Sequence, residues 1–120
     1  MEKKDFEAII LKVIDGIPEE FKSKVDNLSI IIDEFNIPRA DTGSKNNNSN
    51  ITLALYHGVP LTRRSSSKPI FPDKITIYKK AIELVCKNNE EIRKTLKRVV
   101  LHELGHYFGL EEDNLNQLCY

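Results

Sequence analysis

The 120-residue sequence has no tryptophan, a single methionine, two cysteines and no long apolar run. A membrane-spanning helix needs about 20 predominantly apolar residues in a row, and no stretch of this chain approaches that length. The opening Met-Glu-Lys-Lys-Asp does not lead into the apolar core of a secretory signal. Cys86 and Cys119 lack the paired spacing of a disulfide framework. We therefore expect a cytoplasmic chain with reduced thiols and no membrane span.

The charge balance also limits the partners. Lysine plus arginine and aspartate plus glutamate number 18 each, which gives a formal net charge of zero. A balanced chain has no global field that would recruit nucleic acid or an anionic membrane, so we expect neither partner. A chain of this length suits one core, and it contains no internal repeat and no dividing linker. We expect a single domain over residues 1–120.

Hydrophobic periodicity divides the chain into helical and extended segments. Apolar residues three or four positions apart indicate helices, whereas alternation or a run of β-branched residues indicates strands. The expected elements are a helix that ends at Gly16, a short helical segment over 18–25, strands over 28–35, 51–56 and 74–78, a short helix over 81–86, and a long helix that begins after Asn88.

Local signals add detail to this pattern. Residues 74–78 alternate isoleucine with threonine and tyrosine, which predicts a strand buried on one face. Residues 39–50 contain no large apolar side chain, and we expect a mobile loop there. Asn88 and Glu91 have the spacing of a capping box for the long helix. Gly109 can end that helix through a left-handed turn.

The long helix carries His-Glu-Leu-Gly-His at 102–106. Two histidines four positions apart project from nearly the same side of a helix, so His102 and His106 can bind one metal ion. Glu103 lies beside them, where a carboxylate can take the proton of a metal-bound water. Zinc lowers the pKa of such a water from 15.7 to about 7. The motif therefore predicts a zinc site for hydrolysis, with one Zn²⁺ per chain and Glu103 as the general base.

A catalytic zinc usually has three protein ligands and keeps its fourth position for water. Only a short segment follows His106, so a third ligand from downstream must come soon after the helix. A chain that reverses at Gly109 returns a side chain to the metal three residues later, at Glu112. Glu111 and Asp113 are the alternatives. We predict a metal site of His102, His106 and Glu112.

Three sequence segments, called words below, resemble the minimal zincin-like family of small bacterial proteins. This metallopeptidase-like group has an HExxHxxGxx(D/E) motif. The words are Leu-Tyr-His-Gly-Val-Pro-Leu-Thr at 55–62, Pro-Asp-Lys-Ile-Thr-Ile-Tyr at 72–78, and His-Glu-Leu-Gly-His-Tyr-Phe-Gly-Leu at 102–110. The resemblance spans most of the chain. It implies an α+β fold, with a small sheet of about three strands packed on the motif helix, and a zinc site that ends in an acidic residue. The family commonly has aspartate where this chain has Glu112, and this chain has no Met-turn.

The leading functional prediction is a zinc metallopeptidase that acts on a peptide or protein substrate. One alternative is a closed structural zinc site in which Cys119 is the fourth ligand and the domain is an interaction module. Another is a degenerate zincin that binds a protein or peptide without turnover. His57 and Tyr78 are candidates for stabilising an oxyanion in a cleft. An ordinary strand-end histidine is the simpler interpretation of His57, and we assign neither residue as catalytic.

Overall fold

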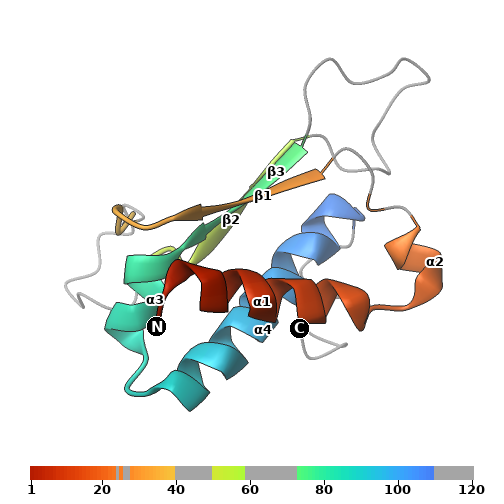
Figure 1. Cartoon of the computed structure of the whole chain (residues 1–120). Helices are drawn as coiled ribbons and strands as arrows, with labels where there is room; N and C mark the ends of the chain where they lie inside the picture. Colours follow the sequence, from red (N-terminus) through yellow and green to blue (C-terminus); the bar gives the residue numbers. More distant parts are fainter. Residues whose placement is uncertain (24, 26–27, 40–49, 59–72, 110–120) are drawn as a thin grey trace.

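The computed structural model describes residues 1–23, 25, 28–39, 50–58 and 73–109. Within these residues the elements follow the order α1 (Lys3–Asp15), α2 (Glu19–Lys22), β1 (Leu28–Asp33), β2 (Ala54–His57), β3 (Asp73–Tyr78), α3 (Lys79–Val85) and α4 (Asn89–Tyr107) (Figure 1). The architecture is α+β, as the resemblance implied. No helix in the described part of the chain is both long and apolar enough to cross a membrane.

The three strands form one mixed sheet in the order β1-β3-β2. β1 pairs with β3 in parallel, and β2 pairs with β3 in the antiparallel sense. Within the described residues, the central position therefore belongs to β3, and β2 is an edge strand. Figure 1 shows α1, α3 and α4 together on one face of this sheet. The fold thus has one layer of helices on one layer of strands, and β2 lies at the edge of the sheet that contacts α4.

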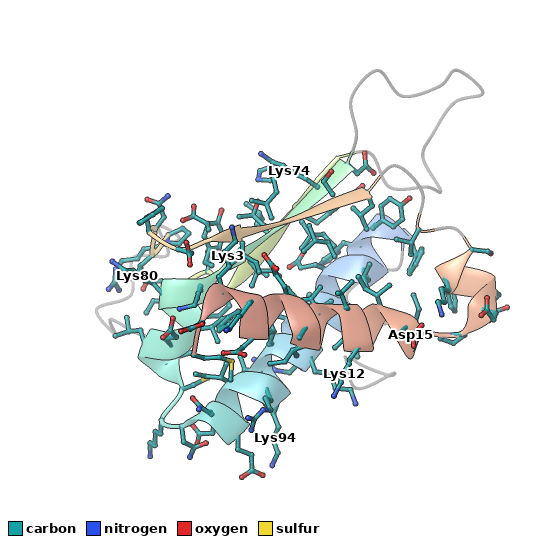
Figure 2. All side chains as sticks on the ribbon, viewed as in Figure 1. Lys3, Lys12, Asp15, Lys74, Lys80 and Lys94 are labelled. Carbon is teal, nitrogen blue, oxygen red and sulfur yellow. The ribbon has the colours of Figure 1, made fainter. Side chains whose placement is uncertain are left out.

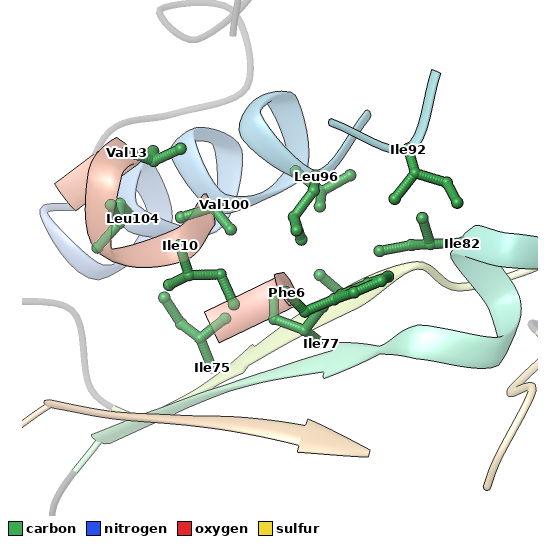
Figure 3. Close-up of a cluster of buried hydrophobic side chains, with 12 residues drawn as sticks. Phe6, Ile10, Val13, Ile75, Ile77, Ile82, Ile92, Leu96, Val100 and Leu104 are labelled. Carbon is green, nitrogen blue, oxygen red and sulfur yellow. The ribbon is translucent and has the colours of Figure 1, made fainter. Parts of the chain in front are cut away.

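The core fills the space between these layers. Isoleucines of β3 point from the sheet toward the apolar stripes of α1 and α4 (Figure 3). Burying each such side chain contributes about 1.5–3 kcal/mol, so these contacts dominate the stability. Charged side chains such as Lys12, Lys74 and Lys94 lie on the outside (Figure 2). The largest fully buried side chains are Tyr107, Phe6, Ile75, Ile77, Ile82, Leu96, Leu104 and Val100.

The third strand differs from the prediction of one buried face. Ile75 and Ile77 are fully buried toward the helices, but Thr76, which points to the other face, is also only 8% exposed. The physical reason is the strand order, because β3 is flanked on both sides by β1 and β2. The alternation of apolar and polar residues shows which side chains are polar, but it does not show which strand is central in the sheet.

Several predicted boundaries shift. The second helical segment is shorter than 18–25, and the first strand ends at Asp33 instead of residue 35. Ile51, predicted as the start of a strand, pairs with Arg39 in an isolated antiparallel bridge, and β2 begins only at Ala54. This bridge joins the chain on either side of residues 40–49 of the predicted loop, which lie outside the described residues.

The long helix begins as predicted, with one change. The Asn88 side chain accepts a hydrogen bond from the Glu91 backbone N–H at 2.9 Å, which caps the helix. The Glu91 carboxylate accepts from the Lys87 N–H at 2.6 Å, one residue before the position that a capping box uses. At the other end, Gly109 has a φ of 85°, the left-handed conformation predicted for it.

Candidate metal centre

The last turns of α4 bring the motif side chains together. Ligand atoms of His102, Glu103 and His106 all lie within 4.8 Å of one another, and the three residues are partly buried. The two imidazole rings have their centroids 4.8 Å apart at an interplanar angle of 76°. The helix positions them because residues four apart share one side, while its apolar stripe faces the core. The histidines therefore lie at the border between the core and the surface.

The chemistry of these donors suits zinc. Imidazole nitrogen and carboxylate oxygen are both ordinary zinc ligands, and partial burial leaves access for an ion and a substrate. Among the described residues, His102, Glu103 and His106 form a group of three histidine or acidic side chains close enough together to hold a metal ion. Glu112, Glu111, Asp113 and Cys119 lie outside the described residues, so their assignments stay predictions.

The edge strand contacts Glu103 directly. The Tyr56 backbone N–H donates a hydrogen bond to Glu103 Oε2 at 3.1 Å. Just before β2, the Leu53 carbonyl accepts from the Tyr78 N–H at 2.9 Å, so these two residues form a hydrogen-bonded pair across the strands. Antiparallel pairs alternate, and hence Ala54 and Tyr56 direct their backbone groups away from β3. Glu103 thus takes a donor on the side of β2 that faces away from β3.

The side chain of the same tyrosine reaches a buried acid. Tyr56 Oη donates to Asp73 Oδ2 at 2.7 Å, and Asp73 is only 3% exposed. The Tyr56 ring also packs edge-to-face against Tyr107, with the centroids 6.1 Å apart. Sequence reasoning missed this role for Tyr56 and Asp73. Both residues lie in the words that carry the family resemblance, but nothing in their spacing shows that they touch.

The structure does not bring His57 or Tyr78 to this centre. Successive side chains alternate between the faces of a strand, and Tyr56 points to the helix side, so His57 points to the opposite face. There it lines a surface pocket of about 430 Å³ together with Lys74, Thr76 and Tyr78. A role for His57 at an oxyanion beside the motif is therefore not supported, and the strand-end interpretation fits its exposed position.

The fold and the paired histidines define a small α+β protein of the zincin type. A profile described as "Zincin-like metallopeptidase" matches residues 25–119, and the chain belongs to that family. A comparison with curated proteins finds no match. Among solved structures, a conserved hypothetical protein from Thermo thermophilus is similar, with 16% identity and a TM-score of 0.59. The similarity covers 90% of this chain and 94% of that one, which supports the fold.

Proposed function

We propose that the chain is a zinc-dependent peptidase in which His102 and His106 hold the metal and Glu103 is the general base. The observation that carries this proposal is the convergence of their ligand atoms within 4.8 Å, on the helix of a zincin-like metallopeptidase fold. Zinc bound there would polarise the substrate carbonyl and lower the pKa of its bound water. We propose Glu112 as the third ligand, on the sequence argument alone.

The Glu103 carboxylate is the group that takes the proton during attack on the scissile carbonyl. Proton transfer is efficient when the base is held within reach of the water, and a side chain with several free torsions is poorly held. The Tyr56 N–H fixes one oxygen of Glu103 from the neighbouring strand. This bond lowers the cost of orienting the base.

The substrate we propose is an extended segment of a peptide or protein. β2 is an edge strand beside α4, and its outward backbone groups suit pairing with an added strand. The Tyr56 N–H already bonds Glu103, so we propose the outward N–H and C=O of Ala54 as groups that pair with the substrate. Pairing there would bring a peptide carbonyl alongside the end of α4.

The test compares two glutamates of one helix. Protein purified without chelator is loaded with zinc and incubated with a peptide library, and cleavage is followed by mass spectrometry. Glu103→Gln should lower turnover by about 10²–10⁴-fold while zinc content stays the same, because the side chain acts on the proton and not on the metal. The matched control is Glu90→Gln, an exposed position in the first turn of α4, which should cleave like wild type.

Two results would contradict the proposal in different ways. Absence of cleavage by fully zinc-loaded wild type favours a zincin that binds without turnover. Loss of zinc from Glu103→Gln makes this residue a ligand and leaves the base unassigned.

A further inference from the structure

The strand that holds Glu103 is itself fixed by a hydrogen bond between partly buried Tyr56 and buried Asp73. Tyr56 joins three groups from two elements: Glu103 of α4 at its N–H, Tyr107 of α4 at its ring, and Asp73 of β3 at its hydroxyl. The register places Tyr56 opposite Ile75, so Asp73 is its diagonal neighbour on the same face of the sheet. The position of the Tyr56 backbone therefore depends on where its side chain is anchored.

Asp73 has the properties of an anchor. Its side chain is buried, and burying a carboxylate is costly unless hydrogen bonds compensate it, so the 2.7 Å bond from the phenol is a strong constraint. Gly58, directly after β2, packs against the Asp73 carboxylate. A Cβ atom at Gly58 would lie only 2.5 Å from Asp73 Oδ1, and its φ of 150° also favours glycine. The carboxylate thus has little room to move.

Asp73 is not a member of the metal-binding group. Within the described residues, that group consists of His102, Glu103 and His106, and the Asp73 oxygens are not among the clustered ligand atoms. A buried acid outside the ligand set, bonded to the residue that holds the proposed base, is more useful as a support than as a reactant.

We infer that Asp73 is a positioning residue for Glu103 and that it acts through Tyr56. The Asp73 carboxylate fixes the Tyr56 phenol, and the phenol fixes the position of β2 relative to α4. The Tyr56 N–H then holds Glu103 Oε2. The catalytic meaning of this chain of contacts rests on the proposed function, whereas the mechanical link does not.

The first measurement follows the link without any substrate. In ¹⁵N-labelled protein, the Tyr56 amide faces away from β3 and is protected by Glu103, so its hydrogen exchange reports that bond. Tyr56→Phe and Asp73→Asn should each raise this exchange rate by about tenfold. The Leu55 amide faces β3 and should keep its protection. Tyr78→Phe removes a phenol from the other face of the sheet and is the matched control.

The second measurement uses turnover. Tyr56→Phe should lower kcat by about tenfold with KM and zinc content unchanged. Combining it with Glu103→Gln should lower turnover no further than Glu103→Gln alone, because the two changes act on one group. A purely structural role for the pair predicts a lower melting temperature and an additive loss in the double variant.

The outcomes separate this inference from the proposed function. Faster Tyr56 exchange in both single variants supports the link even if wild type cleaves no peptide, a result that would count against the peptidase alone. Unchanged exchange at position 56 in Tyr56→Phe overturns the link, whatever the kinetics are. If Asp73→Asn does not fold, Tyr56→Phe decides the matter, since it removes only one hydroxyl.

Discussion

The two faces of the sheet carry similar side chains in different settings. On the helix-covered face, Tyr56 and Asp73 are bonded to each other next to the turn of α4 that carries the motif histidines. On the opposite face, Tyr78, Asp33 and His57 line a surface pocket. Tyrosine, aspartate and histidine therefore occur on both faces. On the helix-covered face, the hydrogen bonds of Tyr56 join Asp73 of β3 to Glu103 of α4, beside the motif histidines.

The difference lies in the partners of the two aspartates. Asp73 is buried and bonds a tyrosine of the neighbouring strand. Asp33 is more exposed and bonds its own turn, since it accepts from the N–H groups of Phe35 and Asn36 at 2.9 and 3.0 Å. A non-local bond between strands can transmit position to a third element, whereas a local turn cannot. The comparison indicates that connection to α4, more than residue type, distinguishes the proposed active face.

The largest effect expected from substitutions that compare the two faces is on the zinc content. His102→Ala and His106→Ala should each empty the site, whereas His57→Ala, the remaining histidine of the chain, should leave zinc at about one equivalent. The measurement is elemental analysis of the three variants after purification without chelator. Full zinc in both His102→Ala and His106→Ala would refute the proposed centre. Zinc loss in His57→Ala would place the metal on the sheet face opposite the helices.

A smaller effect is expected from the third ligand. Glu112→Ala should weaken zinc binding by about 10–100-fold, and Asp113→Ala should change it far less, because only the former lies three residues after the chain reverses at Gly109. Both sites lie outside the described residues, so this prediction depends on spacing. Competition with a fluorescent zinc chelator measures the affinities. A greater loss in Asp113→Ala would shift the ligand by one residue.

Much of the helical structure could be predicted because its signals are local. The apolar stripe, the Asn88 cap and the left-handed Gly109 define α4 from neighbouring residues, and the spacing of His102 and His106 determines that they share one side. The family resemblance supplied the fold class, which the profile match and the similar structure confirm.

The rest depends on contacts between segments that are distant in sequence. The burial of Thr76 follows from the central place of β3, and no pattern within one strand states the strand order. The bond from Tyr56 to Glu103 depends on how β2 lies over α4, and the orientation of His57 depends on the register of the same strand. These are the features in which the sequence interpretation was incomplete.

The smallest expected effect concerns the turn after Asp33, on the sheet face opposite the helices. Hydrogen bonds from the Asn36 side chain and from the backbone N–H groups of Phe35 and Asn36 lower the pKa of Asp33 from its ordinary 3.8. A carboxyl with a lowered folded pKa stabilises the folded state above its unfolded pKa and loses this contribution as the pH falls through the folded value. Asp33→Ala should therefore lower the urea midpoint at pH 6, and the difference from wild type should shrink as the pH falls below about 3.8. Glu34→Gln, a change at the adjacent acid, should keep the wild-type pH dependence. A difference that is the same at pH 6 and pH 3 would show that Asp33 stabilises the turn through packing and not through its charge.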